Sequence, residues 1–272
     1  MLPRYIILNK TRGLTPLETV SAWRKAEGIP NDIPTSYAGR LDPMAEGKLL
    51  VLIGDECKRQ KEYTKLDKEY VIQVVLGIHT DTGDVLGIPT FADSLPVPSH
   101  TSIKTALASE LGTNDRKYPV FSSKTVGGKP LFLYALEQTL DTIEVPSHPE
   151  TFCALELQKA EVLTKAKLAS LVTRSLSLTP TSDEPSKALG ADFRINTIRP
   201  AWEELFKNGH HSEFPILSIK VTCGSGAYMR TLAERIGESL GTAGFALSIR
   251  RTRMGTYQKL PFGLGFWIKE YQ

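Results

Sequence analysis

The sequence predicts an α+β fold, because segments with strand character alternate irregularly with segments that have helical signals. Residues 68–77 are rich in β-branched side chains, as strands are. Residues 15–28 carry the start and stop signals of a helix: Thr15 as the N-cap, a proline at the first helical position, a glutamate that completes a capping box, and a final glycine. The 272 residues suffice for one large domain or two small ones.

The remaining elements follow from the same patterns. Strands are predicted at residues 5–8, 48–53, 152–162, 219–223 and 247–255. Helices are predicted at residues 102–111, 164–178, 200–209 and 229–240, and a surface helix or loop at 55–68. In the helix of residues 15–28, we expect Leu17, Val20 and Trp23 to form the buried face. Residues 89–98 and 179–190 read as connections rich in turn-forming residues.

Composition excludes several classes of protein. Hydrophobic residues make up 41% and charged residues 23%, which is typical of a globular chain. No apolar run approaches the roughly 18–20 residues that span a bilayer, and the N-terminus lacks the apolar core of a signal peptide. The three cysteines form no Cys-x-x-Cys pair, and the five histidines show no metal-ligand spacing. We therefore expect a cytoplasmic protein without a metal or a disulfide framework.

The net charge of +3 is too small to indicate a nucleic-acid partner, but the distribution of charge is uneven. Residues 220–259 contain seven Lys or Arg and two Glu, and the first twelve residues contain three basic side chains and no acid. If the fold brings these two segments together, they form one phosphate-binding face. A solvated basic surface is the alternative.

Asp42 stands out as a candidate catalytic group. It lies between Gly39 and Pro43, and an apolar run at residues 49–53 follows. The proline favours extended geometry at Asp42, and the glycine permits a tight turn beside it. A carboxylate on a stiff loop before a buried strand is suited to present a nucleophile to a pocket. An ordinary Asp-Pro turn between two elements is the alternative.

The pattern around this aspartate is Gly-x-Leu-Asp-x-x-Ala-x-Gly-x-Leu, and it resembles the catalytic motif of the TruB family of RNA pseudouridine synthases. In this chain the pattern is filled by Gly39, Leu41, Asp42, Ala45, Gly47 and Leu49. Four further blocks resemble the family in the same order, at residues 68–87, 118–135, 219–232 and 247–255. Residues 10–16 resemble its N-terminal block in part, with Lys10, Gly13 and Thr15 kept and Thr11 and Pro16 different.

The resemblance implies a role for each matching residue. Asp42, Tyr70 and Arg230 would be catalytic, with Arg230 pairing with Asp42 and holding it ionised. Substrate contacts would come from Lys10, Tyr37, Gly39, Leu41, Lys129, Tyr228, Ile249, Arg250 and Arg251. Of these, Lys10 would orient the Asp42 loop, Tyr228 and Ile249 would line the base pocket, and Arg250 and Arg251 would face the RNA backbone. Without the resemblance, Tyr70 would be read as packing, and Lys10 and Arg230 as surface residues.

The resemblance also implies a fold and a reaction. The pseudouridine synthase fold is a mixed, largely antiparallel sheet flanked by helices, and residues 1–272 would form one catalytic domain without a C-terminal PUA domain. The resemblance lapses at about residues 163–213, where we expect a helical insertion. The implied reaction isomerises uridine 55 in the T arm of tRNA after base flipping, without a cofactor, and a monomer suffices. Asp42 would act either as the nucleophile or as the base that starts glycal formation.

Two features of the sequence limit these expectations. Tyr37 stands where the family has a histidine in Gly-His-x-Gly, and a tyrosine can stack or hydrogen-bond but cannot carry a positive charge. The Asp/Thr/Gly cluster at residues 80–87 lacks the ligand spacing of a calcium loop and reads as a turn built on side-chain hydrogen bonds. The same chemistry on another RNA position and a non-catalytic tRNA-binding protein with the same fold remain the alternatives.

Overall fold

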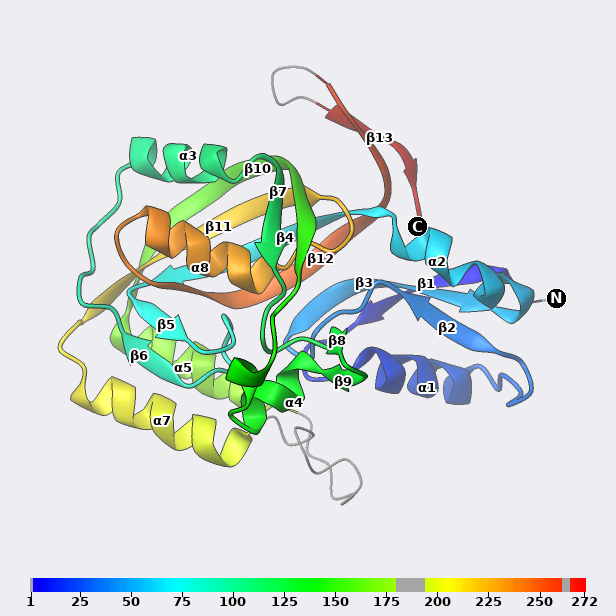
Figure 1. The fold of residues 1–272 in the computed structure, drawn as a ribbon, viewed down its shortest axis with the longest axis horizontal. Helices are drawn as coiled ribbons and strands as arrows, with labels where there is room; N and C mark the ends of the chain where they lie inside the picture. Colours follow the sequence, from blue (N-terminus) through cyan, green and yellow to red (C-terminus); the bar gives the residue numbers. More distant parts are fainter. Residues whose placement is uncertain (1, 180–193, 261–264) are drawn as a thin grey trace.

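A nine-stranded sheet forms the centre of the computed structural model, which describes residues 2–179, 194–260 and 265–272 (Figure 1). The strand order is β1-β3-β12-β4-β11-β10-β7, and β2 pairs with β3 while β13 pairs with β12. Each of these pairs is antiparallel except β3 with β12, which is parallel. The α+β fold with a mixed, largely antiparallel sheet is thus confirmed.

The strands of this sheet are β1 (Tyr5–Lys10), β2 (Thr35–Ala38), β3 (Ala45–Ile53), β4 (Asp67–Leu76), β7 (Gly112–Lys117), β10 (Ser147–Thr164), β11 (Glu213–Cys223), β12 (Gly244–Lys259) and β13 (Gly265–Glu270). Two small hairpins pair β5 (Ile78–Thr80) with β6 (Pro89–Phe91) and β8 (Thr125–Val126) with β9 (Lys129–Pro130). The α-helices are α1 (Pro16–Ala26), α2 (Gln60–Thr64), α3 (His100–Ser109), α4 (Leu131–Leu136), α5 (Lys165–Leu176), α7 (Ile195–Asn208) and α8 (Met229–Ser239). Short 3₁₀ segments lie at Gly54–Arg59 and Leu140–Thr142.

The sheet has a hydrophobic core on each face, because successive side chains of a strand point to opposite sides. On β4, Ile72, Val74 and Leu76 pack with α3 and α8, whereas Val75 belongs to a second cluster with α5 and α7. Trp202 of α7 is buried in that second cluster, and its indole N–H donates to the carbonyl of Val85 at 3.1 Å. The helices α5 and α7 therefore pack on the same sheet that carries the rest of the chain.

The first helix, α1, begins as predicted, but its buried face differs from the expected one. Thr15 and Glu18 form both hydrogen bonds of the capping box, and Gly28 follows the last turn with a φ of +62°. Val20 is buried and Trp23 half-buried, but the expectation for Leu17 was wrong, since 65% of it is exposed. Leu17 lies in the first turn, beside the mouth of a pocket rather than over the sheet.

Most other predicted elements are present with shifted ends. The strand predicted at residues 152–162 runs from Ser147 to Thr164, and the helix predicted at residues 200–209 begins at Ile195. Residues 118–135 contain the β8–β9 hairpin and α4. The connection predicted at residues 179–190 lies outside the described residues from position 180 onward. No helix in the described part of the chain is long and apolar enough to cross a membrane.

Gly47 sits where three strands meet. It pairs with Lys10 of β1 on one side and with Arg251 of β12 on the other. Its φ is +105°, and a Cβ atom at this position would lie 2.2 Å from the carbonyl oxygen of Arg251. Only glycine combines this backbone conformation with such close strand contact, so Gly47 fixes the approach of the Asp42 loop to the sheet.

We expect Gly47→Ala to destabilise the fold more than Gly54→Ala, as measured by urea unfolding. Gly54 has a φ of +63° and open space around its Cβ position, so its substitution costs about 1–2 kcal/mol of backbone strain. Gly47→Ala adds a steric clash worth roughly 1–3 kcal/mol. Equal free energies of unfolding for the two variants would contradict the close contact at Gly47.

Candidate active site

A pocket of about 720 Å³ opens between the Asp42 loop, the start of α8 and residues 121–123. Pockets of this size hold small molecules or single residues of a larger ligand. Nine of the twelve residues predicted for the site line it: Tyr37, Gly39, Leu41, Asp42, Tyr70, Tyr228, Arg230, Ile249 and Arg251. They come from β2, β4, β12, α8 and the connecting loops, so the fold gathers residues that lie far apart in the sequence.

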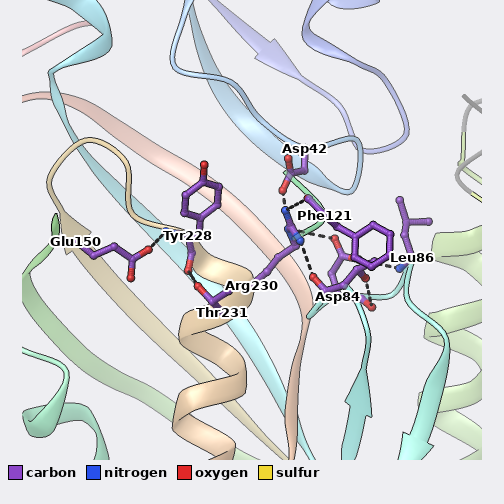
Figure 2. A network of polar contacts seen from close by, with 9 residues as sticks. Asp42, Asp84, Leu86, Phe121, Glu150, Tyr228, Arg230 and Thr231 are labelled. Atoms are coloured by element: carbon purple, nitrogen blue, oxygen red, sulfur yellow. Dashed lines mark hydrogen bonds and ion pairs between the residues drawn. The ribbon is translucent and has the colours of Figure 1, made fainter. Parts of the chain in front are cut away.

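Asp42 and Arg230 form an ion pair at this pocket (Figure 2). The Nε of Arg230 donates to Oδ2 of Asp42 at 2.8 Å. The Arg230 side chain is only 6% exposed, whereas the Asp42 side chain is 48% exposed. The arginine thus holds the carboxylate from within the protein and leaves part of it open to the pocket.

The other donors of Arg230 are also engaged. Its two terminal nitrogens donate to the carbonyls of Thr82 at 2.6 Å and of Phe121 at 2.9 Å. The carboxylate of Asp84 lies 3.9 Å from Nε. Burial opposes the charge on Arg230, but Asp42 and Asp84 together raise its pKa above the usual value. The guanidinium is therefore a fixed positive charge whose orientation is set by three separate segments.

Asp84 was not predicted as a site residue, although it lies in the pocket. Burial raises its pKa, and Arg230 acts in the opposite direction. As expected for a turn, its Oδ1 accepts from the backbone N–H of Leu86 at 2.9 Å and from the Thr82 hydroxyl at 2.8 Å. The feature of the sequence that could have indicated Asp84 is the Asp/Thr/Gly cluster at residues 80–87. The same cluster is equally typical of a turn that has no contact with the site.

Lys10 and Arg251 lie beneath the Asp42 loop and are almost completely buried. The ammonium of Lys10 donates to the carbonyls of Thr11, Pro43 and Ala45 at 3.2, 3.2 and 2.5 Å. The guanidinium of Arg251 donates to the carbonyls of Lys48 at 2.7 Å and of Gly39 at 3.0 Å. Both cations therefore bind the backbone on either side of Asp42.

The expectation that Arg251 faces an RNA backbone was wrong. On β12, Arg251 lies opposite Tyr70 of β4 and Gly47 of β3. Its side chain points into the protein and is only 1% exposed. Arg250, the next residue along the strand, is exposed but does not line the pocket. Lys129 also lies outside the lining residues, where it pairs with Glu137 and contacts the ring of Tyr134.

Two tyrosines contribute both an aromatic ring and a hydroxyl to the pocket walls. Tyr70 is buried, and that burial raises the pKa of its phenol. Burial, together with Tyr118 and Asp42, raises the pKa of Tyr228 to about 12, so both phenols stay neutral at physiological pH. The backbone N–H of Tyr228 donates to the buried Glu150 at 2.9 Å, which anchors the start of α8 (Figure 2).

The mouth of the pocket carries contacts that the sequence did not reveal. Arg40, two residues before Asp42, donates to the hydroxyl of Ser123 at 2.8 Å across the opening. Lys68 lines the pocket, is nearly buried and donates to the carbonyl of Thr64 at 2.8 Å. Arg194 lines the same pocket although it belongs to the segment to which the sequence assigned no chemistry.

This arrangement suits chemistry in which one carboxylate acts as a nucleophile or a base beside a flat, polar ring. Asp42 is the exposed acid, Arg230 fixes it, and the tyrosines with Leu41 and Ile249 supply surfaces for stacking. Among the described residues, no group of three His, Cys, Asp or Glu side chains is arranged to hold a metal ion.

Comparison with known proteins gives a consistent result. A model of the TruB family pseudouridylate synthases (N-terminal domain) matches residues 34–172. A protein of Aromatoleum aromaticum named tRNA pseudouridine synthase B is 30% identical over 255 residues, which cover 93% of this chain and 63% of that protein. A protein of the same name from Xanthomonas oryzae is 27% identical over 90% of this chain and 61% of its own length. The chain thus spans somewhat under two thirds of these relatives.

Solved structures share the fold. A Cbf5–Nop10–Gar1 complex contains a chain that matches 92% of this one with a TM-score of 0.51 and 16% sequence identity, over 48% of its own length. An H/ACA ribonucleoprotein bound to a substrate RNA containing 2′-deoxyuridine contains a chain that matches with a TM-score of 0.50, also at 16% identity. At this identity the likeness concerns the fold alone.

Burial of Lys68 has a measurable consequence for stability. Burial, with Arg251 nearby, lowers the pKa of this ammonium from 10.5 to about 8. The folded chain releases this proton before the unfolded chain does, so the charged lysine destabilises the fold at neutral pH, and the penalty fades as pH rises through 8. From about pH 7 to about pH 9.5, we expect the stability of the wild type relative to Lys68→Met to rise by about 2 kcal/mol in urea unfolding.

Lys61→Met, at an exposed lysine of α2, is the matched control and should show no such trend. If the wild type and Lys68→Met respond to pH in parallel, the ammonium of Lys68 is not desolvated in the folded chain.

Proposed function

This chain belongs to the TruB family of pseudouridylate synthases, and we propose that it isomerises uridine to pseudouridine in tRNA. The observation that carries the proposal is the ion pair of Asp42 with Arg230, in which a buried guanidinium holds a half-exposed carboxylate at a pocket. Binding of RNA alone would not require this buried pair, whose assembly engages three separate segments of the chain.

The reaction breaks the N1–C1′ bond of the uridine, rotates the base and forms a bond between C5 and C1′, while C5 loses its proton and N1 gains one. Asp42 either attacks as the nucleophile or removes the ribose proton that starts glycal formation. Arg230 keeps the carboxylate aimed, because its buried Nε–H donates to Oδ2 of Asp42 at 2.8 Å. Nothing is oxidised or reduced, so the side chains of the pocket suffice without a cofactor.

The pocket supports base flipping as the way of access. A paired or stacked uridine cannot reach a carboxylate that faces a pocket, so the base leaves its stack and enters between Tyr70, Tyr228 and Ile249. The two neutral phenols supply stacking surfaces and hydrogen-bond partners for the uracil ring. Tyr37 lines the same pocket and offers a further aromatic surface.

The substrate we propose is uridine 55 in the T arm. The names of the relatives, tRNA pseudouridine synthase B, support a tRNA substrate, and the sequence resemblance supports the position. Residues 1–272 act as a single catalytic domain, in which α5 and α7 of the insertion at about residues 163–213 pack against the common sheet.

Asp42→Asn should abolish turnover while tRNA binding persists, because the amide keeps the size of the side chain and loses its charge and basicity. Purified protein is incubated with an unmodified tRNA transcript, and pseudouridine is mapped by carbodiimide-stop sequencing. We expect a stop at uridine 55 with the wild type and a loss of more than about a thousandfold in rate with Asp42→Asn.

Asp93→Asn, at an exposed aspartate outside the pocket lining, is the control and should behave as the wild type. A stop at another position keeps the chemistry and overturns the target. A folded wild type that binds tRNA but gives no stop on any RNA overturns the enzymatic proposal in favour of binding alone.

A further inference from the structure

Arg194 joins the segment outside the family resemblance to the pocket. It precedes α7 and adopts a left-handed backbone conformation, with φ +56° and ψ +26°, which is uncommon for a residue other than glycine. Its carbonyl accepts from the backbone N–H groups of Thr197 and Ile198 at 2.9 Å each. Because Ile195 and Ile198 are buried in the core under α7, the backbone of Arg194 is held by a rigid element.

The side chain of Arg194 contacts two segments of the pocket wall. Its guanidinium makes a two-point ion pair with the carboxylate of Asp81, with distances of 2.6 and 3.0 Å. It also lies over the ring of Phe121, with its central carbon 4.5 Å from the ring centroid. Paired and stacked arginines of this kind are well oriented, since both contacts use the planar face or edge of the group.

These two segments are the ones that orient Arg230. The carbonyl of Phe121 accepts from one terminal nitrogen of Arg230, and the carbonyl of Thr82, adjacent to Asp81, accepts from the other. Arg194 therefore contacts Phe121, which supplies one of these carbonyls, and Asp81, the residue next to Thr82, which supplies the other. Figure 2 shows Asp42 and Phe121 on different sides of the Arg230 guanidinium, with Asp42 at its Nε and Phe121 at a terminal nitrogen.

We infer that Arg194 is a positioning residue for the pair of Arg230 and Asp42. By binding Asp81 and Phe121 together, it fixes the spacing of the two carbonyls between which the Arg230 guanidinium is clamped. Small displacements of such supports lower the rate of a reaction well before they unfold the protein. The inference rests on the proposed function for its kinetic consequence, and on the contacts alone for its structural one.

The kinetic test compares Arg194→Met with Arg199→Met on the unmodified tRNA transcript. Arg199 lies on α7, five residues after Arg194 and outside the lining of the pocket, so it controls for the loss of a nearby arginine. We expect Arg194→Met to lower kcat roughly 3- to 30-fold with an unchanged Kd for tRNA, and Arg199→Met to leave both unchanged. A raised Kd with an unchanged kcat would instead make Arg194 an RNA contact and overturn the inference.

Asp81→Asn adds a second arm. If Arg194 acts through Asp81, the variant that carries both Arg194→Met and Asp81→Asn loses no more activity than Arg194→Met alone. A loss equal to the sum of the two single losses, in free energy of activation, would contradict the coupling. Arg194→Lys keeps the charge without the two-point geometry, and it replaces Arg194→Met in each measurement if the latter loses its cooperative unfolding transition.

A structural measurement separates this inference from the proposed function. In protein labelled with ¹⁵N-arginine, the Nε–H resonance of Arg230 is assigned by its loss in Arg230→Lys. We expect this resonance to shift in Arg194→Met and to stay in place in Arg199→Met. An unmoved resonance in Arg194→Met overturns the inference. A moved resonance in a protein that modifies no RNA sustains the positioning role and refutes the proposed function.

Discussion

The orientation of one buried guanidinium, that of Arg230, is the constraint on which the pocket depends. A fully charged group is tolerated in the interior only if acceptors surround it, and here those acceptors are a carboxylate and two carbonyls from three separate segments. The strand β11, the turn after it and α8 deliver the arginine from one side, and the Asp42 loop meets it from another. The ion pair of Arg230 with Asp42 can therefore form only when most of the fold is in place.

Two further buried cations support the same loop by a different device. Lys10 and Arg251 bind backbone carbonyls rather than carboxylates. They therefore link neighbouring segments through hydrogen bonds to the backbone and not through ion pairs. Within the loop itself, Leu41 and Met44 are buried in the hydrophobic cores on either side of Asp42. The long side chains that reach in from β1 and β12 add to this packing, and a stiff loop keeps Asp42 at a constant distance from Arg230.

Local patterns in the sequence sufficed for most of the fold and little of the site. The β-branched side chains of residues 68–77 located β4, and the capping signals located α1, because both signals depend on neighbouring residues. Leu17 was misjudged because an apolar residue in a first turn can face a pocket as easily as a core. Arg251 was misjudged because its register in β12 is set by pairing partners in β3 and β4. The pairing of Asp42 with Arg230, 188 residues apart, followed from the family resemblance alone. The carbonyls of Thr82 and Phe121 carry no side-chain signature, so no sequence pattern marks them.

The parallel pairing of β3 with β12 has a consequence for the order in which the molecule assembles. It joins segments near the two ends of the chain, and the bond from Arg251 to Lys48 spans 203 residues. Contacts of such high sequence separation close slowly, because their loop entropy is lost before their energy is gained. During synthesis on a ribosome, β3 leaves the exit tunnel long before β12 exists, and the backbone N–H and C=O groups on that edge of β3 then have no partner strand. The hydrogen bonds from Arg251 to the Asp42 loop and the ion pair with Arg230 consequently form late, so a nascent chain carries Asp42 for most of its synthesis without either contact.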